Sequence, residues 1–122
     1  MSEDTRDPRL PPRGERTGHR MPHRRNVLER RVVQHPGGNF LEYTLSTNRK
    51  STLFAIEECW YDPAEEHKGH GGMARWMVTY VTTSSRKRFD AWLAAVRAMP
   101  PADPASIEAR RPESLKNANW DA

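Results

Sequence analysis

Three consecutive basic residues, Arg86-Lys87-Arg88, follow the hydroxyl run Thr82-Thr83-Ser84-Ser85. The residues after the triplet repeat with the period of a helix, so the basic side chains fall in its first turn. Free N–H groups and a partial positive charge make basic residues unfavourable there by roughly a few tenths of a kcal/mol each. A bound anion would reverse this cost. We therefore predict that Arg86, Lys87 and Arg88 hold phosphate of a nucleic acid; the alternative is that they extend into water.

Other basic and aromatic residues could contribute to the same contact. Further phosphate contacts are predicted from Arg49, Lys50 and Arg75 and from the N-terminal arginines, including Arg24 and Arg25. Tyr61 and Phe40 fall on the outer face of the predicted sheet, where rings can stack on unpaired bases. Alternation places other aromatic residues on the core face, where packing explains them: Tyr43, Trp60, Trp76 and Tyr80.

A short stretch resembles a known family. Trp60-Tyr61-Asp62-Pro63 followed by Lys68-Gly69 is similar to the Trp-Pro-loop-Lys-Gly segment of single-strand-binding transcriptional coactivators. The order of strands followed by a helix is also similar, and the resemblance implies single-strand binding. The chain departs from the family after this loop, where a full strand precedes the helix, so membership is not inferred.

The residue pattern offers little for catalysis or metal binding. Glu57 and Glu58 are neighbours on a predicted strand and point to opposite faces, so they cannot act as a carboxylate pair. Cys59, the one cysteine, is interpreted as a small apolar residue. The polar stretch 65–70 contains glutamate and histidine without the paired spacing of a metal site. We predict no enzyme activity, no cofactor and no metal.

Composition sets the size and class of the protein. The chain has 122 residues, 35% of them hydrophobic, and ten prolines, which fits one small domain with segments outside its core. Lys and Arg exceed Asp and Glu by 20 to 16, giving a net charge of +4. This balance permits a polyanion partner without requiring one. The lack of a long apolar run or an apolar leader predicts a cytoplasmic protein with no membrane partner.

Hydrophobic periodicity predicts the elements. Residues 1–26 are expected to form a disordered basic arm, 27–99 an α+β domain and 100–122 a Pro-containing tail. Strands are predicted at 27–33, 40–45, 52–61 and 75–81, connected as an antiparallel meander. A helix starts near Ser84 or Ser85 and ends at Met99-Pro100-Pro101. Its apolar stripe, predicted to lie on one face of the sheet, is Phe89, Trp92, Leu93 and Val96.

These features predict a small non-enzymatic domain that binds nucleic acid. Phosphate contacts would come from the helix start and the N-terminal arm. The alternative is a protein–protein adaptor or inhibitor that docks on a larger complex, such as one that handles nucleic acid. A homodimer formed through an unpaired sheet edge would be compatible with either function.

Overall fold

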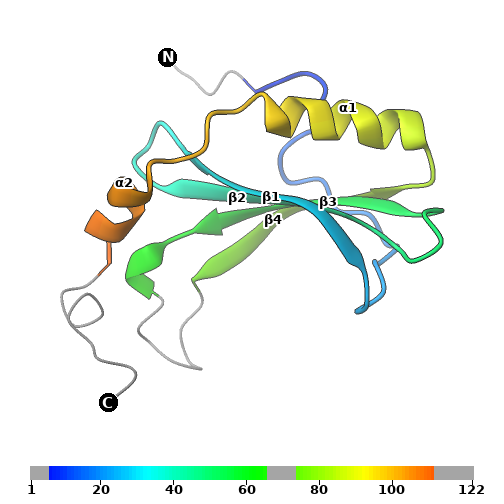
Figure 1. The fold of residues 1–122 in the computed structure, drawn as a ribbon, viewed down its shortest axis with the longest axis horizontal. Helices are drawn as coiled ribbons and strands as arrows, with labels where there is room; N and C mark the ends of the chain where they lie inside the picture. Colours follow the sequence, from blue (N-terminus) through cyan, green and yellow to red (C-terminus); the bar gives the residue numbers. More distant parts are fainter. Residues whose placement is uncertain (1–5, 66–73, 112–122) are drawn as a thin grey trace.

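The computed structural model describes residues 6–65 and 74–111. Four strands form one antiparallel sheet in the order β1-β2-β3-β4: Asn26–Gln34, Phe40–Thr47, Phe54–Tyr61 and Arg75–Thr83. Helix α1 (Arg86–Arg97) lies across one face of the sheet, and the short helix α2 (Pro104–Ala109) follows at the side (Figure 1). The predicted α+β meander with a packed helix is therefore confirmed. Within the described residues, no helix has the length and apolar character needed to cross a membrane.

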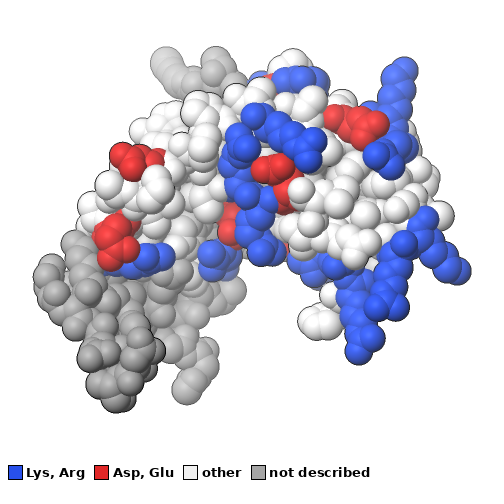
Figure 2. Space-filling model, in the orientation of Figure 1, with Lys and Arg blue, Asp and Glu red and all other residues white. Residues whose placement is uncertain are grey.

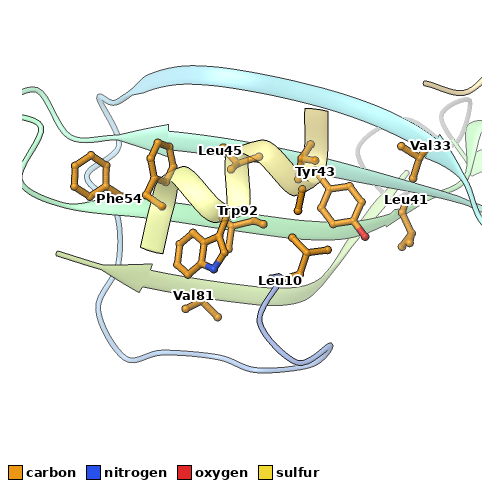
Figure 3. Close-up of a cluster of buried hydrophobic side chains, with 12 residues drawn as sticks. Leu10, Val33, Leu41, Tyr43, Leu45, Phe54, Val81 and Trp92 are labelled. Atoms are coloured by element: carbon orange, nitrogen blue, oxygen red, sulfur yellow. The ribbon is translucent and has the colours of Figure 1, made fainter. Parts of the chain in front are cut away.

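The core lies between α1 and the sheet (Figure 3). β2 and β3 contribute alternate residues to the helix face, because side chains at every second position share a face. Leu45 pairs with Ile56, which pairs with Val81 of β4, and each is 0 or 1% exposed. Phe54 stacks on Phe89 of α1 with ring centroids 4.9 Å apart. The predicted stripe of α1 is the buried face of the helix, with Leu93 partly buried beside it.

A bulge in β4 changes which of its residues face the helix. Glu58 pairs with Thr79, but the next residue of β3, Cys59, pairs with Met77, so β4 has one extra residue there. Strict alternation predicts Trp76, Val78 and Tyr80 on the core face. Tyr80 instead pairs with Glu57 on the opposite face. That part of the prediction is wrong, because the pleat alternates only as far as the bulge.

The N-terminal segment was predicted to be disordered, but its described part packs against the sheet. Leu10 is 7% exposed and belongs to the core cluster. Residues 15–17 lie along the outer edge of β4, where Tyr80 donates its N–H to Glu15 and Thr17 donates to Tyr80, forming a parallel bridge at Arg16. The segment then continues on the face opposite α1 (Figure 1). Its backbone satisfies the β4 edge, which a count of apolar residues does not predict.

The other sheet edge is partly covered by the chain that follows α1. Ala102 donates its N–H to the carbonyl of Val32 at 2.8 Å, and the Arg31 side chain donates to the carbonyls of Arg97 and Met99. Asp103 caps α2 by accepting from Ala105 at 3.0 Å. The beginning of the predicted tail is thus attached to the domain through β1.

Candidate nucleic-acid interface

The loop between β2 and β3 presents two exposed basic residues, Arg49 and Lys50. The side chain of Asn48 holds this loop closed, because its carbonyl oxygen accepts from the backbone of Thr52 at 2.8 Å and of Leu53 at 3.1 Å. Asparagine often replaces a backbone acceptor in tight turns in this way. The loop therefore projects both cations from a defined base.

The N-terminal segment brings a third cation to the same place. Arg24 lines a surface hollow of about 320 Å³ together with Pro22, Asn48, Arg49 and Lys50. Residues separated by more than twenty positions in the sequence are thereby neighbours in space. Arg24 is exposed, like the two loop residues.

The start of α1 completes this end of the molecule. Ser85 caps the helix as predicted, accepting from the Arg88 N–H at 3.1 Å, and its first turn contains no acidic residue. The Arg86 guanidinium lies 5.7 Å from the ring centroid of Phe54, the residue at which β3 leaves the hairpin loop. That contact ties the helix start to the β2–β3 hairpin. We call the combined surface the basic tip: Arg24, Arg49, Lys50, Arg86, Lys87 and Arg88.

Figure 2 shows basic side chains gathered at the end of the molecule where Figure 1 places the β2–β3 hairpin and the start of α1. Over residues 6–65 and 74–111, Asp90 is the one carboxylate paired with the tip, through an exposed bond to Arg86 of 3.1 Å. Such exposed pairs are weak and easily replaced. The tip is therefore a surface whose positive charge is mostly uncompensated by its neighbours.

Two of the predicted phosphate ligands lie elsewhere and are engaged with carboxylates. Arg25 pairs with Glu57 at 3.4 Å on the face opposite α1. Arg75 pairs with Glu42 at the start of β4, at the other end of the sheet from the tip. Burial raises the pKa of Glu57, while Arg25 opposes that rise. Both arginines thus balance buried or half-buried acids, and the structure does not bring them to the tip.

The predicted stacking residues are not on the surface. Phe40 is 1% exposed and Tyr61 is 4% exposed, and their ring centroids lie 6.3 Å apart. The Arg75 guanidinium covers the Tyr61 ring at 4.5 Å. Neither ring presents a face to solvent on which a base could stack. The outer face of a sheet is not always exposed, and here burial removes both rings from the candidate interface.

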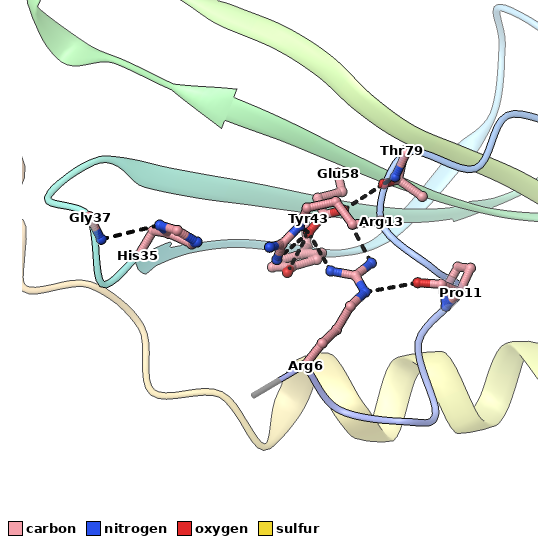
Figure 4. A network of polar contacts seen from close by, with 9 residues as sticks. Arg6, Pro11, Arg13, His35, Gly37, Tyr43, Glu58 and Thr79 are labelled. Carbon is pink, nitrogen blue, oxygen red and sulfur yellow. Dashed lines mark hydrogen bonds and ion pairs between the residues drawn. The ribbon is translucent and has the colours of Figure 1, made fainter. Parts of the chain in front are cut away.

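Sequence reasoning missed a second arginine cluster, in which partly buried arginines surround a buried carboxylate. Glu58 is 1% exposed on the helix face of β3 and accepts from Arg6 at 2.8 and 3.1 Å and from Arg13 at 3.1 Å (Figure 4). The hydroxyls of Tyr43 and Thr79 donate to it at 2.8 and 2.6 Å. We call this group of residues the Glu58 cluster.

The charge state of the cluster follows from its geometry. Burial alone would raise the pKa of Glu58, but the hydrogen bonds from Arg6, Thr79 and Tyr43 lower it to about 2. Burial and the neighbouring Glu58 carboxylate raise the pKa of Tyr43 to about 12. Glu58 is therefore ionised and Tyr43 neutral across the physiological range. The cluster attaches the N-terminal segment to the sheet. Neither Glu58 nor Tyr43 gains or loses a proton near neutral pH.

Neither a thiol nucleophile nor a metal centre is evident in the parts of the chain that can be described. Burial and nearby carboxylates raise the pKa of Cys59 to about 11, so it is a thiol at neutral pH. Residues 6–65 and 74–111 contain no group of three or more side chains suited to hold a metal ion. Most of the polar stretch 65–70, and Lys68-Gly69 of the coactivator-like segment, lie outside the described residues.

Comparison of the chain with protein-family models, with curated proteins and with solved structures found no match.

Proposed function

We propose that this protein binds nucleic acid through the basic tip and catalyses no reaction itself. One observation carries the proposal: residues from the N-terminal segment, the β2–β3 loop and the start of α1 converge on one end of the molecule. Converging cations, exposed N–H groups of a helix start and few carboxylates are the features that bind phosphate oxygens.

The proposed contact is to the phosphate backbone and not to bases. The rings nearest the tip, Phe54 and Trp92, are 3% and 1% exposed, and arginines cover them. Base stacking needs an open ring face. We therefore expect little sequence preference and binding to duplex at least as tight as to single strands, which differs from what the coactivator resemblance implies.

A salt series tests the proposal. Fluorescence anisotropy of labelled duplex and single-stranded oligonucleotides should show affinity falling log-linearly with salt, by about 0.9 in slope per phosphate contact on duplex. The triple variant Arg24→Ala/Arg49→Ala/Lys50→Ala should flatten that slope by about two or three.

A matched control removes the same charge elsewhere. Arg9→Ala/Arg97→Ala/Arg110→Ala deletes three exposed arginines that pair with carboxylates away from the tip. We expect this variant to keep most of the salt slope, apart from a small long-range effect at low salt. Equal effects of the two triple variants would mean that net charge, and not the tip, governs binding. Absence of binding at low salt would overturn the proposal.

The adaptor alternative has one observation in its favour. Val27 and Leu28, at the start of the edge strand β1, are 42% and 44% exposed, beside a bulge that interrupts the pairing with β2. Exposed apolar residues on a sheet edge suit a protein partner or a second copy of the chain. Since residues 15–17 occupy the β4 edge, a sheet-edge dimer would use β1. Size-exclusion chromatography tests this dimer: Leu28→Lys should elute as a monomer under conditions in which the wild type elutes as a dimer.

A further inference from the structure

The two edges of the sheet are covered to different extents. Residues 15–17 pair with the outer side of β4 through two backbone hydrogen bonds. At the β1 edge, Ala102 donates to Val32, and within residues 6–65 and 74–111 this is the one backbone bond from another segment to the outer side of β1. The first part of β1, residues 26–31, is therefore an open strand edge in the described structure.

The pairing pattern shows which backbone groups of this edge face outward. The N–H and C=O groups of successive residues in a strand point alternately to its two sides. The Val32 carbonyl points away from β2, toward Ala102. The N–H and C=O of Arg30, two residues earlier, therefore also point away from β2. An added strand can bond to Arg30 without displacing any bond of the sheet.

Two apolar side chains lie on the same edge. Val27 and Leu28 are 42% and 44% exposed. The register with β2 shifts between Val27 and Glu29, so that Leu28 has no direct partner on β2. Exposed neighbouring apolar residues of this kind suit contact with an apolar side chain of another molecule.

The side chains around this edge carry an excess of positive charge. Arg30 is 56% exposed, and its ion pair with Glu42 is long, at 3.9 Å. On the helix side of β1, the carboxylate of Glu29 is shared by Arg31 and Arg97, at 3.4 and 3.0 Å. Three arginines thus surround one carboxylate of the edge strand. This imbalance favours a partner with acidic side chains.

We propose that the β1 edge binds an extended segment of a protein partner that carries acidic and apolar side chains and adds to the sheet beside residues 26–31. Main-chain bonds to Arg30 supply affinity, and the flanking side chains supply selectivity. A second copy of this chain would bring its own arginines to the edge, where like charges oppose pairing. The proposal gives the adaptor alternative a kind of partner and does not depend on nucleic-acid binding at the basic tip.

Fluorescence anisotropy of the full chain with a labelled heptapeptide that alternates glutamate with valine tests the proposal. We expect saturable binding at physiological salt, and binding at least tenfold weaker when lysine replaces glutamate. Two further peptides are N-methylated, one at every glutamate and one at every valine. At least one of them should bind at least tenfold more weakly, because the N–H groups on one side of the added strand face β1.

Variants of the protein test the position of the site. Arg30→Glu should weaken binding of the glutamate peptide at least tenfold and strengthen binding of the lysine peptide. Arg9→Glu is the matched control, since Arg9 is an exposed arginine that pairs with Asp7 away from β1, and its affinity should stay within about twofold of the wild type. Arg49→Ala/Lys50→Ala should keep peptide binding while weakening oligonucleotide binding, which separates this proposal from that for the tip.

Four results would overturn the proposal. They are absence of saturable binding of the glutamate peptide, equal affinity for the parent and both N-methylated peptides, and equal effects of Arg30→Glu and Arg9→Glu. The fourth is elution of the wild type alone as a dimer that Leu28→Lys converts to a monomer, because a second copy would then occupy the edge.

Discussion

Arginine has two different roles in this protein, and they differ in whether its charge lies against a buried carboxylate or in solvent. In the Glu58 cluster, Arg6 and Arg13 donate to a carboxylate that is 1% exposed. In the basic tip, Arg24 and Arg49 are exposed, and no acidic partner for them is found over residues 6–65 and 74–111. A charge removed from water must be paired within the protein, whereas a charge at the surface is solvated and can pair with another molecule. Stability should therefore depend on the first region and polyanion binding on the second.

The largest loss of stability is expected from a substitution in the Glu58 cluster. Glu58→Gln leaves two arginines beside a neutral amide and should lower the free energy of unfolding by about 3 kcal/mol or more. Urea titration measures it. Glu108→Gln, which removes an exposed partner of Arg111, is the control and should cost less than about 0.5 kcal/mol. Similar losses of unfolding free energy in both variants would show that the Glu58 cluster stabilises the fold no more than an exposed ion pair does.

Acid should remove the same stabilisation. Because the pKa of Glu58 is lowered to about 2 from an ordinary 4.5, its contribution is complete above about pH 5 and is lost as pH falls from 4.5 toward 2. The difference in unfolding free energy between wild type and Glu58→Gln should be constant from pH 5 to 7 and shrink below 4.5. Urea titrations at several pH values check this. A difference that is as large at pH 2.5 as at pH 7 would contradict the assignment.

A smaller loss of stability is expected at the basic tip, where Ser85 caps α1. Ser85→Ala removes the bond to the Arg88 N–H and should cost about 1 kcal/mol, because a capping hydroxyl satisfies a helix-end donor. Ser84→Ala, at the preceding exposed position, is the control. Thermal unfolding measures both. A loss that is the same for the two serines would mean that the cap contributes nothing at this helix start.

The smallest effect has the opposite sign. Lys87→Glu replaces an exposed cation in the first turn of α1 with an anion, which the helix dipole favours by about 0.3–1 kcal/mol at low salt. The variant should therefore be slightly more stable and bind oligonucleotide more weakly. Thermal unfolding and anisotropy together measure this. A variant that is both less stable and equally able to bind would refute a functional reason for the basic helix start.

The predictable parts of the fold are those with local signals. Alternation at Leu41, Tyr43 and Leu45 and the apolar stripe of α1 predict the sheet and its helix. A capping serine, Ser84 or Ser85, predicts the helix start, and Ser85 is the cap. The Glu58 cluster has no such signal, because Arg6 and Arg13 are 52 and 45 positions away from their partner. The β4 bulge is equally hidden, since one extra residue leaves the composition unchanged.

The candidate site was predicted only in part for the same reason. Arg49, Lys50 and the basic residues of the helix start are exposed, but sequence could not show that Arg24 lies beside Arg49 and Lys50 while Arg25, its neighbour, pairs with Glu57. Nor could it show that Tyr61 is covered by Arg75. These outcomes depend on contacts between segments far apart in the chain.

Nuclear magnetic resonance tests the central claim most directly. A ¹⁵N-labelled sample of the full chain would be titrated with a short duplex at low salt, and the shifts of assigned backbone amides compared between the two arginine regions. We expect shifts concentrated in residues 23–24, 48–52 and 84–89, with Gly14 and Thr79 near the Glu58 cluster unchanged. Shifts concentrated around Gly14 and Thr79, or no shifts at all, would contradict it.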